Sequence, residues 1–218
     1  AIVGPSGCGK STLLSMLCGL TKPEGGTITI DGVPLTKSPS AIGYMLQKDH
    51  LFEWRNIFSN ISLGLEIQKR LDEPARQELL EMMAAYGLAG FEYAKPSELS
   101  GGMRQRAALI RTLALKPDLL LLDEPFSALD YQTRLSVCDD ISSIIRQTHK
   151  TAILVTHDLS EAISVADRIL VLSPRPGRVK KILSIDFPEN CIRSLDRRNC
   201  PEFSTYFNMV WKELKTYE

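Results

Sequence analysis

Short apolar runs alternate with segments of helical periodicity through much of this chain. The runs at Leu119–Leu122, Ala152–Thr156 and Ile169–Leu172 have strand length, and helical periods fill Tyr131–Thr148 and Ser160–Ala166 between them. Strands made almost wholly of Leu, Ile and Val are buried on both faces, which is typical of a parallel sheet covered by helices. The pattern therefore predicts an α/β fold.

Further elements are expected on either side of this region. They are a strand stub at Ala1–Val3, a helix at Ser11–Leu20, strands at Thr27–Ile30 and Ala41–Met45, a helical region over about 48–93 with its clearest period at Glu73–Tyr86, a helix opened by Ser100, and a helical aromatic stripe over 203–214. The stub is shorter than the usual strand of about five residues. No Met opens the chain, so we expect further sequence ahead of Ala1.

Composition narrows the class of protein. The chain has 26 Lys and Arg against 26 Asp and Glu, so it lacks the basic surplus of a dedicated nucleic-acid binder. No apolar run approaches the roughly 18–20 residues that cross a bilayer, so any membrane link would run through a partner. The five cysteines show no metal-ligand spacing, and we expect reduced thiols without a disulfide or zinc site.

A complete P-loop motif follows the first strand. Its nine residues, counted with the threonine that follows it, are Gly4, Pro5, Ser6, Gly7, Cys8, Gly9, Lys10, Ser11 and Thr12. Glycines let such a loop wrap tightly, so that its backbone N–H groups and the next helix N-terminus face phosphate oxygens. We expect Lys10 to bridge the β- and γ-phosphates of a nucleotide and Ser11 to ligate Mg²⁺.

Two carboxylates stand where the Leu119–Leu122 run ends. Ligands bind at the carboxyl ends of parallel strands, so Asp123 and Glu124 should face the phosphates. Adjacent acids at a strand end are often only a solvated turn, but the P-loop favours a functional interpretation. Asp123 would hold Mg²⁺ through a water, and Glu124 would polarise the attacking water as general base.

Two further polar residues end neighbouring strands. Gln47 follows Ala41–Met45, and its amide can ligate Mg²⁺ and hydrogen-bond the attacking water. His157 follows Ala152–Thr156, where its imidazole could contact the γ-phosphate. Taken alone, such residues are more often a surface glutamine and a structural histidine.

The order of motifs resembles that of ABC transporter ATP-binding subunits. The matching segments are the P-loop, Gln47, Leu99–Gln105, Leu119–Glu124, Ser127–Asp130 and His157. The resemblance implies a RecA-like P-loop NTPase core over 1–47 and 111–183, an inserted helical subdomain over 48–110, and a C-terminal helical tail over 184–218.

The same resemblance implies how the chain would work. Two copies would form a head-to-tail dimer around two ATP molecules with Mg²⁺. Ser100, Gly101 and Gly102 would contact the γ-phosphate bound by the opposite copy, consistent with an anion site at a capped helix N-terminus. Gln105 and the Asp130 loop would couple the two sites. In the family an aromatic residue from an upstream strand stacks on adenine, and this chain does not contain that region.

A finer resemblance is to importer subunits of the nitrate, sulfonate and taurine group, on the residues 51–57, 124–130 and 203–214. It implies an ATPase on the cytoplasmic face of the membrane, bound to transmembrane permease subunits and served indirectly by a solute-binding protein. Residues 48–65 would dock the permease through Phe52 and Trp54, although the same residues could simply pack the helical subdomain. The alternatives are the ATPase of an exporter or lipoprotein-release system and, third, a non-transport ABC ATPase.

Overall fold

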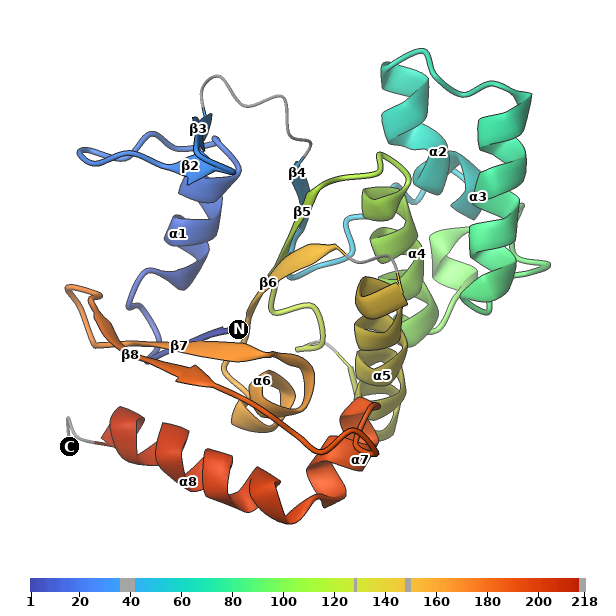
Figure 1. Ribbon diagram of the computed structural model, residues 1–218. Helices are drawn as coiled ribbons and strands as arrows, with labels where there is room; N and C mark the ends of the chain where they lie inside the picture. Colours follow the sequence, from blue (N-terminus) through green and yellow to red (C-terminus); the bar gives the residue numbers. More distant parts are fainter. Residues whose placement is uncertain (36–41, 128, 148–149, 216–218) are drawn as a thin grey trace.

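The computed structural model describes residues 1–35, 42–127, 129–147 and 150–215 (Figure 1). Within them, a six-stranded sheet has the order β4-β5-β6-β1-β7-β8. Neighbours from β4 to β7 run parallel, whereas β8 runs antiparallel to β7. The mostly parallel sheet confirms the α/β prediction. The strands of this sheet and of a separate hairpin, β2–β3, are β1 (Ile2–Val3), β2 (Thr29–Ile30), β3 (Val33–Pro34), β4 (Ile42–Met45), β5 (Leu119–Asp123), β6 (Thr151–Val155), β7 (Arg168–Leu172) and β8 (Val179–Ser184).

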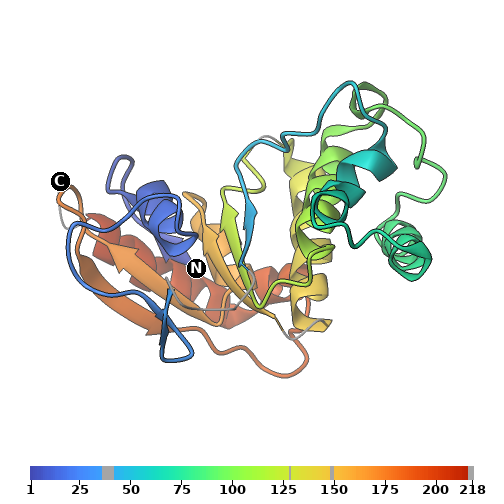
Figure 2. The ribbon, with the colours of Figure 1, turned by 90° about the horizontal axis from the view of Figure 1, so that it is seen from above.

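Helices surround the sheet. They are α1 (Lys10–Leu17), α2 (Ile57–Ile67), α3 (Glu73–Ala85), α4 (Gly101–Leu113), α5 (Tyr131–Gln147), α6 (Leu159–Val165), α7 (Ser194–Asn199) and α8 (Pro201–Lys215), with a short 3₁₀ helix at Pro96–Glu98. Figures 1 and 2 place α1 on one side of β5 and β6, and α4 with α2 and α3 on the other. Among the described residues, no helix combines the length and apolar character that a membrane crossing needs.

The four leucines of β5 divide between the two faces of the sheet. Leu119 and Leu121 belong to a hydrophobic cluster with Leu14 of α1. Leu120 and Leu122 belong to another, which includes residues of α4 and α5. Successive strand side chains point to opposite faces, so a run of leucines is what a strand covered on both sides requires.

Helix α4 joins two hydrophobic cores. Its Ala108 and Leu109 lie in the cluster beneath the sheet, together with β5. Its Ala107 and Ile110 lie in a second cluster with α2 and α3. The helical region therefore has a core of its own, while the division of the chain at 48 and 110 stays a prediction.

The aromatic stripe near the C-terminus packs onto the core, as its period indicates. Val210 of α8 is fully buried in a cluster with residues of α6, β1 and β7, and Phe203 and Tyr206 pack against it. The Tyr206 hydroxyl also donates to the carbonyl of Asp186 at 2.9 Å.

Several boundaries differ from the predicted ones. Strand β8 was not predicted, because only Leu183 of its six residues is buried and the strand lies at the sheet edge. Helix α1 ends at Leu17 rather than Leu20, because Gly19 takes a left-handed φ of 79°. The predicted positions Ala41, Ala128 and Thr148 lie outside the described residues.

The prediction of five reduced cysteines was wrong for one pair. Cys191 and Cys200 form a disulfide, with their Cα atoms 7.0 Å apart. The two residues flank α7, and this single short helix brings both ends of the segment together. Spacing alone could not show this, because it depends on where α7 begins and ends.

The remaining cysteines differ in exposure, which predicts an order of alkylation. Cys18 is partly exposed, whereas Cys138 is fully buried and burial raises the pKa of its thiol to about 12. Iodoacetamide at about pH 8 should modify Cys18 in the native chain, Cys191 and Cys200 only after reduction, and Cys138 only after unfolding. Peptide mass spectrometry reads the order. Labelling of Cys191 without a reductant would contradict the disulfide.

Candidate functional site

The P-loop runs from β1 into α1. Gly7 and Gly9 have φ angles of 75° and 104°, which favour glycine. At Gly4 a Cβ atom would lie 3.0 Å from Leu172 Cβ, and at Gly177 one would lie 2.2 Å from the Cys8 carbonyl oxygen. The end of β7 and the β7–β8 connection therefore lie so close to the P-loop that Gly4 and Gly177 have no room for a Cβ atom unless their neighbours move.

Lys10 turns its ammonium group into this loop. The residue is 8% exposed, and Nζ donates to the carbonyl oxygens of Gly4 at 2.8 Å and Pro5 at 3.1 Å. Ser6, Gly7, Ser11 and Thr12 are exposed at the mouth of the loop. A buried cation beside a helix N-terminus suits an anionic ligand such as a phosphate group.

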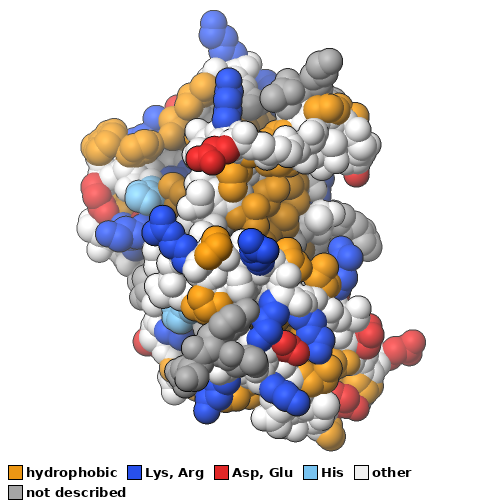
Figure 3. Space-filling view, turned by 90° about the vertical axis from the view of Figure 1, so that its left-hand side faces the viewer, with side chains coloured by type: hydrophobic (Ala, Val, Ile, Leu, Met, Phe, Trp, Pro, Cys, Tyr) orange, Lys and Arg blue, Asp and Glu red, His pale blue; other side chains and the backbone are white. Residues whose placement is uncertain are grey.

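The side of the molecule that carries α1 and the β7–β8 connection also offers apolar surface. Figure 3 shows hydrophobic side chains gathered in the middle of this side and Lys and Arg side chains around them. Leu20, which follows α1, is 74% exposed, and Val179 of β8 is 60% exposed. Apolar and cationic groups are thus available on the same side as the loop.

A carboxylate from β5 meets the P-loop. The Ser11 hydroxyl donates to Asp123 Oδ1 at 3.2 Å, and the Tyr44 hydroxyl donates to Asp123 Oδ2 at 3.3 Å. Burial and the charge of Asp123 raise the pKa of Tyr44. The structure thus brings Ser11 and Asp123 together, and a hydroxyl with a carboxylate is the hard oxygen donor set that Mg²⁺ prefers.

Three residues predicted to be catalytic converge beside this pair. Gln47 Nε2 donates to Glu124 Oε2 at 3.1 Å, and His157 Nδ1 lies 3.2 Å from the same oxygen. Glu124 has a φ of 46°, and its backbone N–H donates to the Val155 carbonyl at 2.8 Å. The left-handed turn directs the chain away from β5, and this places the carboxylate between the ends of β4 and β6.

Ser100, Gly101 and Gly102, the signature residues predicted to contact the nucleotide of a second copy, lie elsewhere. Ser100 caps α4, its hydroxyl accepting from the Met103 N–H at 3.4 Å, and Gly101 is exposed beside it. A Cβ at Gly102 would lie 2.6 Å from Thr133 Cγ2, so this end of α4 fits closely against the start of α5. Because α4 and α1 lie on opposite sides of β5 and β6 (Figures 1 and 2), the chain does not bring these residues to its own P-loop.

The turn before α5 carries the last predicted residue. Asp130 accepts from the Thr133 N–H at 3.1 Å, and hydrogen bonding by Thr133 lowers the pKa of its carboxyl. Arg134 joins this turn to the one after His157: it donates to the Leu129 carbonyl at 2.9 Å and lies 3.7 Å from Asp158.

Sequence reasoning missed three contributors to this arrangement. Tyr44 holds Asp123, Arg134 links two turns, and the Ser127 hydroxyl lies 3.3 Å from Gln47 Nε2. A hydroxyl within the otherwise apolar β4 was the signal for Tyr44. The other two depend on contacts between distant segments.

Comparison with known proteins agrees with the motifs. The family model described as ABC transporter matches residues 1–127. An uncharacterised ABC transporter ATP-binding protein, YtlC of Bacillus subtilis, is 47% identical over 218 residues, covering 100% of this chain and 84% of that protein. The taurine import ATP-binding protein TauB of Yersinia pestis is 44% identical over 186 residues, which cover 85% of this chain and 73% of that protein.

Solved structures show the same fold. The dimeric structure of MJ0796, a bacterial ABC transporter cassette, has a TM-score of 0.72 and 30% identity, covering 86% of this chain and 85% of that one. A dimeric post-hydrolysis state of the same cassette, bound to ADP and Pi, has a TM-score of 0.71. With its P-loop, paired carboxylates and capped signature helix, the chain belongs to the ABC transporter family as an ATP-binding subunit with the P-loop NTPase fold, an ATPase whose hydrolysis is coupled to transport.

Proposed function

We propose that this subunit energises an importer for a small anionic solute of the sulfonate or nitrate kind. The convergence of Gln47 and His157 on Glu124, beside the Ser11–Asp123 pair, carries the hydrolytic part of the proposal. The likeness to a taurine import subunit supports the solute class.

ATP would bind with its phosphates in the P-loop. The Lys10 ammonium exchanges its carbonyl partners for phosphate oxygens, while the loop N–H groups and the N-terminus of α1 face the same charge. Ser11, Gln47 and Asp123 would hold Mg²⁺, which neutralises charge on the phosphates. Tyr44 keeps the Asp123 carboxylate oriented toward Ser11.

Glu124 would act as the general base for the attacking water. Its side chain is 22% exposed, so water can reach it, and the contacts from Gln47 and His157 limit its rotation. A positioned base contributes about 10²–10⁴-fold to a rate. His157, with a side chain that is 63% exposed, would contact the γ-phosphate.

A second copy of the chain would complete the site. Ser100, Gly101 and Gly102 present a capped helix N-terminus, which is suited to an anion, but they lie on the side of β5 and β6 opposite to α1. A head-to-tail pair places each of these N-termini against the γ-phosphate of the other copy. Asp130 and the buried Gln105 would lie near the contact between the copies and couple the two sites.

The segment after Gln47 would bind the transmembrane permease. Trp54 is 74% exposed, its ring centroid lies 4.7 Å from that of Phe52, and Lys95 Nζ donates to its carbonyl at 2.9 Å. Exposed aromatic residues on an ordered loop are favoured at interfaces. The subunit would then lie peripherally on the cytoplasmic face, and a solute-binding protein would act on it through the permease.

Replacing Glu124 tests the hydrolytic role. Glu124→Gln should lower kcat for ATP by about 10²–10⁴-fold, because the amide cannot accept the proton. ATP binding should remain, since Lys10 and Ser11 are unchanged. Phosphate release and nucleotide binding are measured together, with Glu81→Gln on the exposed side of α3 as control. Hydrolysis near the wild-type rate would remove Glu124 from the role of base.

Uptake tests the transport role. Cells that carry the intact subunit should accumulate one member of a labelled panel of taurine, alkanesulfonates and nitrate, and cells with Glu124→Gln should lose that accumulation. Retention of a compound by the mutant cells, with no uptake lost, would instead indicate an exporter. The Glu81→Gln subunit should support uptake at the wild-type level.

A further inference from the structure

Two arginines of α4 hold the loop that follows Gln47. Arg104 contacts both carboxylate oxygens of Asp49, Nε to Oδ2 at 2.9 Å and an Nη to Oδ1 at 3.1 Å, and a further Nη reaches Glu53 at 3.0 Å. Arg111 donates to the backbone carbonyls of Asp49 at 2.6 Å and His50 at 2.8 Å. The loop is therefore fixed to α4 through its backbone and through one carboxylate.

The Arg104–Asp49 contact is stronger than an ordinary surface pair. The two side chains are 25% and 19% exposed, and a two-point contact between a guanidinium and a carboxylate adds directionality to the charge attraction. Asp49 also accepts from the Leu51 N–H at 3.0 Å. Burial alone would raise the pKa of Asp49, but the hydrogen bonds from Arg104 and Leu51 outweigh burial and lower it.

Gln47 lies in the short segment that leads from β4 to this attachment. Leu46, Gln47 and Lys48 are all exposed, so they lie between two fixed points, the buried Met45 and the ion-paired Asp49. The Gln47 amide nevertheless has to stay 3.1 Å from Glu124. A misplacement of about 1 Å in a catalytic arrangement can lower a rate about 10²-fold.

We propose that Arg104 is a positioning residue for ATP hydrolysis, which acts through Asp49 to hold the Gln47 amide against Glu124. Arg104 lies one turn of α4 after Ser100, so the residue that fixes the Gln47 loop belongs to the first turns of the helix that carries the signature. The inference rests on the proposed role of Gln47, and the experiment below separates the two.

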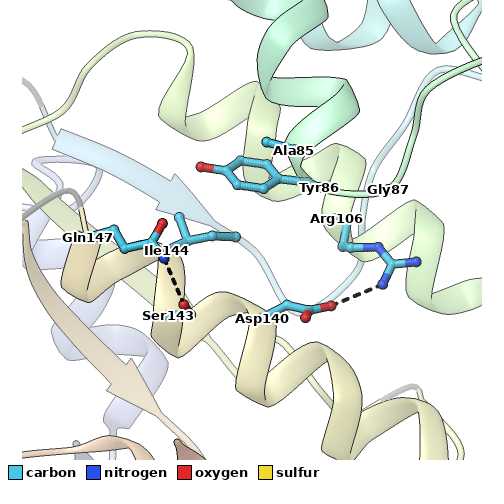
Figure 4. Close-up of a pocket in the computed structure, with 8 residues that line it drawn as sticks. All are labelled: Ala85, Tyr86, Gly87, Arg106, Asp140, Ser143, Ile144 and Gln147. Carbon is cyan, nitrogen blue, oxygen red and sulfur yellow. Dashed lines mark hydrogen bonds and ion pairs between the residues drawn. The ribbon is translucent and has the colours of Figure 1, made fainter. Parts of the chain in front are cut away.

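The same helix supplies a matched control. Arg106, two residues further along α4, pairs with Asp140 at 3.1 Å and is 21% exposed, close to the value for Arg104 (Figure 4). This pair lies at a pocket of about 340 Å³ formed with Tyr86 and Gly87 at the end of α3 and with residues of α5. Replacing Arg106 therefore removes an ion pair from the same helix without touching the Gln47 loop, although this pair is a single contact to a carboxylate that is 44% exposed.

Arg104→Gln should lower kcat about 10–100-fold and leave KM for ATP within about two-fold, because the P-loop is untouched. Arg106→Gln should keep kcat within about two-fold of the wild type. Asp49→Asn should resemble Arg104→Gln, and the double variant should be no slower than the slower single one, since both changes break one contact. Arg104→Lys, which keeps the charge but not the two-point contact, should be intermediate.

Gln47→Ala separates the possible failures. If Gln47→Ala lowers kcat and Arg104→Gln does not, the positioning role of Arg104 is overturned, whereas the proposed role of Gln47 in hydrolysis is retained. If Gln47→Ala leaves kcat unchanged, the proposed role of Gln47 and the present inference both fail. Thermal unfolding by circular dichroism accompanies each variant. An equal loss of kcat in Arg104→Gln and Arg106→Gln, tracking their melting temperatures, would also overturn the proposal.

Discussion

The packing of α4 between two hydrophobic cores is the constraint on which the rest of the structure depends. One face of this helix, with Ala108 and Leu109, packs in the cluster of the sheet, and the other, with Ala107 and Ile110, packs with α2 and α3. A helix buried on two faces has little freedom to rotate or slide, because either movement opens a void in one core. Apolar contacts thereby set the position of Ser100 relative to the acidic end of β5, although Ser100 and the acidic residues are themselves polar.

The polar site uses the same principle at shorter range. Asp123, Gln47 and His157 stand at the last residue of a strand or just after it, so the core fixes the backbone that carries them. Asp123 is the last residue of β5, Gln47 follows β4, and His157 follows β6. Hydrogen bonds then orient the two carboxylates at the end of β5. Ser11 and Tyr44 donate to Asp123, and Gln47 donates to Glu124.

Local patterns predicted those parts of the molecule that local physics determines. The P-loop, the acidic end of the Leu119–Leu122 run and the Ser100 cap could each be identified because their neighbours along the chain determine their conformation. Strand β8 could not, since its exposed edge position leaves almost no apolar alternation. The Cys191–Cys200 bond also escaped prediction, because it depends on where α7 begins and ends. The Arg104–Asp49 pair escaped it because its two residues lie 55 positions apart and meet only in the folded chain.

The central claim of this account is that two copies complete each ATP site, and a mixing experiment tests it most directly. Lys10→Ala disables the P-loop and Ser100→Arg blocks the signature end of α4, so either variant alone should hydrolyse little ATP. In a mixed pair, the intact P-loop of one copy faces the intact signature of the other, and hydrolysis should recover. A mixture with no more activity than the sum of its two components, although the Ser100→Arg chain still binds ATP, would contradict the shared site.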